Sequence, residues 1–260
     1  MTRQEADIIA QAGAAKAALS QKAPMRYLTR AMLAGCYIFI GTLVSCLSAA
    51  WFYADHTAVA KLLGALTFSA ALILIVLLGA ELFTGCNFVM GFTLYDGKTK
   101  VSSLIRVWVL CYIGNFIGIF ILCLLLSGSS ASRDMLSAYL AIIVPGKLTA
   151  PWYQLLLKGV LCNLCVCIGV YSGFKLKSEA GKVAVIVCVI FTFVLAGFEH
   201  SIANMAYFTL YALMVPGAAA SAAGIAANMI WVTIGNILGG AVLLALPMWF
   251  LSDRAVPEHQ

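Results

Sequence analysis

Two polar interruptions lie inside long apolar stretches of this chain, and they limit its possible folds more than any other feature. The first reads Gly79-Ala-Glu-Leu-Phe-Thr-Gly-Cys-Asn87, and the second reads Gly197-Phe-Glu-His-Ser-Ile-Ala-Asn204. A charged side chain or an irregular backbone at such a depth is costly in hydrocarbon, and it is tolerated where it is buried in protein or lines a cavity. A matched pair of interrupted apolar segments, one in each half of a chain, points to a transport site.

The composition places the chain in a lipid bilayer. Of its 260 residues 63% are hydrophobic and 10% are charged, which is too few charges to cover a soluble domain. A helical span needs about 20 apolar residues. The pattern therefore predicts an all-α polytopic membrane protein with six transmembrane helices, near residues 29–50, 62–95, 101–127, 152–174, 182–215 and 227–251. The second and fifth stretches are too long for one continuous helical crossing, so each is expected to be two half-helices.

The basic residues predict the orientation. Most of the 16 Lys and Arg residues fall on one side of the membrane when the N-terminus is inside, so both termini are expected in the cytoplasm of a prokaryotic cell. The net charge of +6 is then a topology signal and not a sign of nucleic-acid binding. We expect a cytoplasmic segment at 1–27 with an interfacial helix, a transport domain at 28–251 and a cytoplasmic tail at 252–260.

Nine cysteines allow two interpretations. Cys162, Cys165 and Cys167 form a C-x2-C-x-C cluster that is compatible with a metal site. Free cysteine also behaves as a small buried apolar residue, and most of these cysteines lie inside predicted spans. The second interpretation is favoured, so no disulfide, metal or cofactor is predicted.

The two halves of the chain resemble each other, over about 28–127 and 152–251. Gly79-x-Glu81 recurs as Gly197-x-Glu199, and Ile113-Gly-Asn-Phe-Ile-Gly118 recurs as Ile234-Gly-Asn-Ile-Leu-Gly239. Three predicted spans precede the second copy, so the copies are expected to cross the bilayer in opposite directions as an inverted three-plus-three repeat. The breaks in spans 2 and 5 would then meet near the midplane.

Four segments resemble the formate/nitrite transporter family. They are Glu81-Leu-Phe-Thr-Gly85, Lys158-Gly-Val-Leu-Cys-Asn163, Gly197-Phe-Glu-His-Ser-Ile-Ala-Asn-Met205 and Val232-Thr-Ile-Gly-Asn236. The resemblance extends over about residues 24–251. It implies an aquaporin-like fold and a homopentamer, with one pore per protomer for small monovalent anions such as formate, nitrite or hydrosulfide. Lys147-Leu-Thr-Ala-Pro151 is more similar to the nitrite and hydrosulfide branches than to the formate branch.

The resemblance assigns the pore to His200, Thr84, Lys147 and Asn163. His200 is the only histidine in the apolar segments, and its ring either donates a hydrogen bond to an anion or passes it a proton, unless it is a satisfied core residue. Thr84 is expected to donate to an anion opposite His200 or to cap a half-helix. Lys147, in an expected outer loop, either concentrates anions above His200 or is a solvated lysine at a span end.

The remaining candidates are structural or apolar. Glu81 and Glu199 could carry protons, but the favoured interpretation is structural, in which each carboxylate accepts backbone N–H bonds in a broken helix. Asn87, Asn163 and Asn204 are expected to satisfy the same backbone. By resemblance, two narrow apolar constrictions are formed by Phe68, Leu72, Leu82, Phe83, Val166 and Phe193. Ordinary helix packing is the alternative for these six side chains.

Two other functional classes compete with an anion pore. An aquaporin-like channel for water or small neutral solutes would show the same broken spans, although His200 and Lys147 favour anions. An enzyme is disfavoured, because the sequence lacks a metal-ligand set and a Ser-His-Asp arrangement.

Overall fold

The computed structural model describes residues 1–218 and 221–252, and within these residues the regular structure is helical. The helices are α1 (Arg3–Lys22), α2 (Pro24–Tyr53), α3 (Thr57–Leu78), α4 (Phe83–Tyr95), α5 (Val101–Ser129), α6 (Arg133–Thr149), α7 (Trp152–Lys175), α8 (Glu179–Leu195), α9 (Ser201–Met214), α10 (Ala222–Ile237), the π-helical segment η1 (Leu238–Ala245) and α11 (Leu246–Phe250). Except for Ser252, the tail predicted at 252–260 lies outside the described residues.

Both predicted interruptions break the helix. α3 ends at Leu78 and α4 begins at Phe83, while α8 ends at Leu195 and α9 begins at Ser201. Gly79 and Gly197 have φ angles of 75° and 71°, a left-handed conformation that glycine adopts without a Cβ penalty. Both breaks therefore begin with a glycine in the left-handed conformation.

Five helical stretches among the described residues are long and apolar enough to cross a membrane: Pro24–Tyr53, Thr57–Leu78, Val101–Ser129, Trp152–Lys175 and Ala222–Phe250. The predicted span at 182–215 is divided between α8 and α9, which have 17 and 14 residues and are each too short for this criterion. Large apolar side chains such as Leu125, Leu157 and Phe250 are exposed on the outside of the bundle. Such a surface suits lipid or another apolar partner and not water.

Close helix packing depends on glycine at two pairs of helices. A Cβ on Gly118 of α5 would lie 2.1 Å from the Met32 carbonyl oxygen of α2, and one on Gly235 of α10 would lie 2.3 Å from the Leu156 oxygen of α7. Small residues let helix backbones approach in this way. Both glycines belong to the repeated segments Ile113–Gly118 and Ile234–Gly239, which therefore serve packing within the chain.

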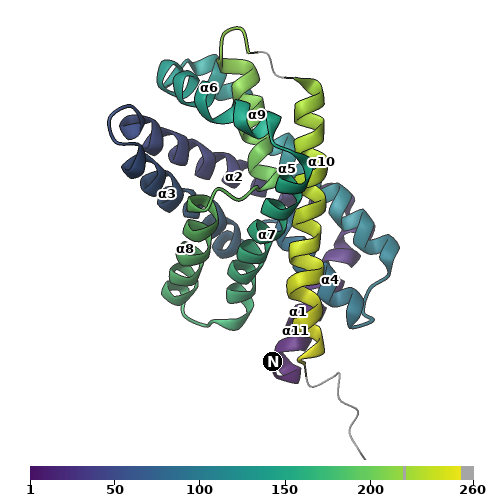
Figure 1. Ribbon diagram of the computed structural model, residues 1–260. Helices are drawn as coiled ribbons and strands as arrows, with labels where there is room; N and C mark the ends of the chain where they lie inside the picture. The colour runs from purple at the N-terminus through teal and green to yellow at the C-terminus, as the bar shows by residue number, and fades with distance from the viewer. Residues whose placement is uncertain (219–220, 253–260) are drawn as a thin grey trace, which may run out of the picture.

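The N-terminal helix α1 packs against the rest of the helical bundle with one face and exposes polar residues on another. Ile9 of α1 is fully buried, and a Cβ on Gly13 would overlap the Thr93 hydroxyl of α4 at 1.9 Å. In Figure 1, α1 and α11 lie at the same end of the molecule, and α6 lies at the opposite end. The apolar face of α1, which predicted an interfacial helix, is thus covered at least in part by α4.

Two local features differ from the sequence expectation. The outer loop expected before the fourth span contains α6, whose Leu136, Leu140 and Val144 recur every four residues and are fully buried. Lys147 consequently lies in the last turn of a helix. The final span contains η1, where Gly240 lies so close to Asn163 that a Cβ would come within 2.7 Å of its Nδ2. Single-turn π segments are often found beside functional sites.

Candidate functional site

One asparagine satisfies the backbone of each break. Asn115 of α5 accepts a hydrogen bond from the Phe83 N–H at 2.9 Å and donates to the Glu81 carbonyl at 2.9 Å. In the second break, Asn236 of α10 accepts from the Ser201 N–H at 2.9 Å and donates to the Glu199 carbonyl at 3.0 Å. Irregular backbone in an apolar setting must find such partners. The repeated Ile-Gly-Asn motif was the available signal in the sequence, but this role was not predicted for either asparagine.

The two breaks meet at a hydrogen bond between Thr84 and His200. The Thr84 Oγ1 and the His200 Nε2 are 2.9 Å apart, and both residues are buried. His200 is the N-cap residue of α9, and its Nδ1 accepts a hydrogen bond from the Ala203 N–H at 3.0 Å. Because Nδ1 is an acceptor, the neutral ring carries its proton on Nε2 and donates it to Thr84.

Thr84 does not cap its own half-helix. The N-cap position of α4 is Leu82, which makes no side-chain capping bond, and Thr84 lies within the first turn. The capping interpretation of Thr84 was therefore wrong. Its hydroxyl faces His200.

A lysine–glutamate pair lies beside the second break. The Lys147 Nζ donates to both carboxylate oxygens of Glu199, each at 2.9 Å, and to the Asn204 Oδ1 at 3.1 Å. It also lies 5.3 Å from the centre of the Tyr207 ring. Asn204 in turn donates to Glu199 at 2.6 Å and to Asn228 at 2.8 Å. The partners of Glu199 and Asn204 are thus side chains, and the expectation that they bind the broken backbone was wrong.

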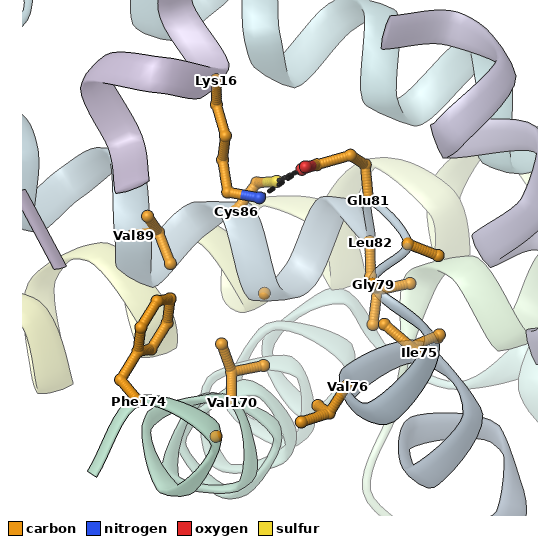
Figure 2. A pocket seen from close by; sticks show the side chains of 13 residues that line it. Lys16, Ile75, Val76, Gly79, Glu81, Leu82, Cys86, Val89, Val170 and Phe174 are labelled. Carbon is orange, nitrogen blue, oxygen red and sulfur yellow. Dashed lines mark hydrogen bonds and ion pairs between the residues drawn. The ribbon is translucent and has the colours of Figure 1, made fainter. Parts of the chain in front are cut away.

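A second lysine–glutamate pair lies beside the first break (Figure 2). The Lys16 Nζ of α1 lies 2.5 Å from the Glu81 Oε2, and the Cys86 thiol and the Tyr27 hydroxyl each donate to the same oxygen at 3.4 Å. The expectation of backbone partners was therefore wrong for Glu81 too. Burial lowers the pKa of Lys16, but the nearby Cys86 and Glu81 outweigh it, so this pKa lies above its usual value and the ammonium is charged.

The Lys16–Glu81 pair lines a cavity, here called the inner cavity, of about 220 Å³. Its walls come from α1, α3, α4 and α7 and include Leu82, Val89, Val170 and Phe174. Lys16 was not predicted from the sequence, because a lysine on a polar N-terminal helix gives no sign of a partner 65 positions away.

Asn163 links the two halves of the site. Its Nδ2 lies 3.2 Å from the Thr84 carbonyl, 2.6 Å from the Asn236 carbonyl and 3.1 Å from the Asn87 Oδ1. Asn163 thus donates to the backbone beside the first break. Asn87 contributes an acceptor to Asn163 and was wrongly expected to bind the backbone itself.

The six apolar candidates are all buried but lie in different surroundings. The Phe193 ring stacks beside His200 with centres 6.1 Å apart, and it meets the Phe68 ring at 5.9 Å. Leu82 lines the inner cavity, whereas the Phe83 ring packs against Tyr112 of α5 at 4.9 Å and is not among the cavity-lining residues. Leu72 and Val166 are buried in the core. Phe68 and Phe193 are thus candidates for a constriction beside His200, and Leu82 is a candidate for one at the inner cavity.

Comparison with known proteins identifies the family. The family model described as formate/nitrite transporter matches residues 3–250. The chain belongs to the formate/nitrite transporter family. Similar relatives include the nitrite transporter NirC of Escherichia coli, at 31% identity with 92% of this chain and 88% of the relative covered, and a probable formate transporter of Methanothermobacter thermautotrophicus, at 32% identity with 93% and 94% covered.

Solved structures of the family share the fold. An FNT family ion channel superposes with a TM-score of 0.88 at 28% identity, covering 98% of this chain and 99% of that one. A pentameric formate channel with formate bound gives a TM-score of 0.76 at 29% identity, covering 89% and 98%. This formate/nitrite transporter family member is accordingly a multi-pass membrane protein and not an enzyme.

Proposed function

We propose that the chain forms a pore for small monovalent anions of weak acids, with formate and nitrite as its substrate class. The observation that carries the proposal is the Thr84–His200 contact, with a Lys–Glu pair beside each of the two breaks that form it. Relatives named as nitrite and formate transporters support this substrate class.

The proposed path runs from the inner cavity past Leu82 to Thr84 and His200, and then past Phe193 to Lys147. In this arrangement the two half-helices of each broken span share one crossing, which gives six crossings in an inverted repeat. The correspondence between the contacts of Asn115 and Asn236 supports the repeat.

The lysines supply the preference for anions. Each lysine is paired with a carboxylate, so each site is close to neutral at rest, but the ammonium remains able to turn toward an arriving anion. At an effective dielectric constant of about 20, a unit charge 4 Å away interacts with an anion by about 4 kcal/mol. A channel for water or neutral solutes would gain nothing from two such lysines.

At the centre, we propose that His200 acts as a neutral hydrogen-bond donor. An imidazolium needs a proton on Nδ1, but that atom accepts the Ala203 N–H at 3.0 Å. Protonation would therefore set two N–H groups against each other and remove the helix cap. The anion is accordingly met by the Nε2–H and the Thr84 hydroxyl without a full positive charge at the narrowest place.

The assembly and orientation follow from the same proposal. The solved relative described as a pentameric formate channel supports a homopentamer with one pore in each protomer. The excess of Lys and Arg supports cytoplasmic termini, which puts the inner cavity on the cytoplasmic side.

Anion flux into proteoliposomes tests the function. We expect swelling with formate and nitrite to exceed swelling with glycerol, and Thr84→Val to lower anion flux. Thr29→Val is the matched control, because the Thr29 hydroxyl is exposed and binds only its own helix at the Met25 carbonyl. Equal anion and glycerol permeation would support the neutral-solute channel, and equal loss in both variants would remove Thr84 from the path.

A further inference from the structure

Two thiols from different helices meet at Glu81, at the edge of the inner cavity. The Sγ atoms of Cys86 on α4 and Cys111 on α5 are 4.0 Å apart. Cys86 donates to the Glu81 Oε2 at 3.4 Å and Cys111 to the Glu81 carbonyl oxygen at 3.1 Å. Both are free thiols, and the Cys86 side chain lines the cavity in Figure 2.

We propose that Cys86 and Cys111 form a reversible redox site that lowers anion flux when a small two-electron oxidant of the peroxide class enters the inner cavity. The effect on flux rests on the proposed transport function, whereas the chemistry of the pair does not.

Access and polarity make Cys86 the thiol that reacts first. It borders the cavity, whereas Cys111 is fully buried behind it. Cys86 lies in the first turn of α4, and its thiol and the Lys16 ammonium both contact the Glu81 Oε2. The Glu81 carboxylate already accepts the Cys86 S–H, so it is in place to take the proton.

The reaction with hydrogen peroxide has two steps. The Cys86 sulfur attacks one peroxide oxygen and the O–O bond breaks, which leaves a sulfenic acid on Cys86 and, with the thiol proton, one water. The Cys111 sulfur then attacks the Cys86 sulfur, and the S–O bond breaks to release a second water. Two thiols lose two electrons and peroxide gains two. The sulfur atoms must close from 4.0 Å to about 2.05 Å for the disulfide to form.

Disulfide formation changes the hydrogen bonding of Glu81. The carboxylate oxygen Oε2 loses the Cys86 donor and keeps Lys16, at 2.5 Å, and Tyr27, at 3.4 Å. The Glu81 carbonyl oxygen loses the Cys111 donor and keeps Asn115. A carboxylate with fewer donors holds its remaining cation more strongly. Lys16 then turns less readily toward an anion in the inner cavity, and flux falls.

The test uses the full chain in proteoliposomes. The protein is treated with hydrogen peroxide, remaining thiols are blocked with N-ethylmaleimide, and peptides are mapped by mass spectrometry without reduction. Formate flux is measured before and after oxidation, and again after dithiothreitol. We expect a peptide linked through Cys86 and Cys111, together with a severalfold loss of flux that dithiothreitol reverses.

Variants separate this pair from the other cysteines. Cys111→Ala is expected to abolish both the linked peptide and the loss of flux, with Cys111→Ser as a second variant should alanine impair folding. Cys123→Ala is the matched control, since Cys123 is buried on the same helix and does not line the inner cavity, and it is expected to retain both effects.

Three results overturn the proposal: no linked peptide in the wild type, a linked peptide with unchanged flux, or an equal loss of flux in the Cys111 variants. If the untreated protein passes no formate, the transport function fails, and peptide mapping still tests whether the pair oxidises.

Discussion

Breaking the Lys147–Glu199 pair separates its structural role from its role in transport. Lys147→Met keeps an apolar stem beside Tyr207 but leaves the Glu199 carboxylate without its cation. Removing one partner of a buried ion pair costs about 3–5 kcal/mol. Since the Lys147 side chain is 19% exposed and Asn204 still donates to the carboxylate, we expect the lower end, about 3 kcal/mol.

The same change also makes the site negative. For an anion about 10 Å from the uncompensated Glu199 carboxylate, at an effective dielectric constant of about 20, the repulsion is about 1.7 kcal/mol. Anion flux is therefore expected to fall by more than about tenfold. Adding Glu199→Gln removes the uncompensated charge. The double variant should regain most of the lost stability but only part of the flux, because the ammonium that contacts the anion is still missing.

The assay combines denaturant unfolding in detergent with formate and nitrite flux in proteoliposomes. Lys61→Met is the control, because it removes an exposed lysine at the start of α3. Wild-type flux in the double variant would refute a direct contact between Lys147 and the anion. Unchanged stability in Lys147→Met would refute the buried pair itself.

Three further predictions concern other parts of the path. His200→Asn is expected to keep the cap on the Ala203 N–H, since asparagine is a good N-cap residue, and to lower flux without changing the shape of its pH profile from about pH 5 to 8; a changed shape would mean that the histidine titrates. Leu82→Ala is expected to raise lactate permeation relative to formate, because the wall of the inner cavity loses bulk there, and an unchanged ratio with a loss of about 2–5 kcal/mol would make Leu82 a packing residue. A hydrogen bond from Lys175 lowers the pKa of Glu5 below its ordinary value, so this contact stabilises the docked first turn of α1 at higher pH and is lost as the pH falls through the lowered pKa. Limited proteolysis of α1 along an acid titration measures this, and in Glu5→Gln that acid-dependent step should be absent.

The breaks were predictable from the sequence, but most of their contacts were not. Each break is marked by local signals inside an apolar stretch: a glycine, a charged residue and an asparagine. Because burying such residues in hydrocarbon is costly, they indicate a break in the helix. The partner of Glu81 could not be identified, because Lys16 lies on another helix and resembles any solvated lysine. The cap on α9 was also missed, because histidine is not among the preferred N-cap residues.

Two local features, the helix α6 and the π-helical segment η1, were also not predicted from the sequence. The buried four-residue spacing from Leu136 to Val144 indicated a helix, yet Pro145 and Gly146 favoured a loop. A proline near the end of a helix is tolerated when few hydrogen bonds depend on its missing N–H. The π-helical segment was not predicted either; in it Gly240 packs closely against Asn163 and Cys167, contacts that the sequence does not reveal.

The capped ring of His200 also limits how long an anion stays in the pore. Its Nε2–H already has an acceptor in Thr84, so an arriving anion replaces one hydrogen bond with another and gains little free energy. The Ala203 N–H fixes the ring plane, so the donor does not have to reorient when the anion arrives or leaves. A shallow well with a rigid donor gives a short residence time, and conduction requires binding weak enough for the ion to leave. The cap that begins α9 thereby favours rapid turnover over tight retention.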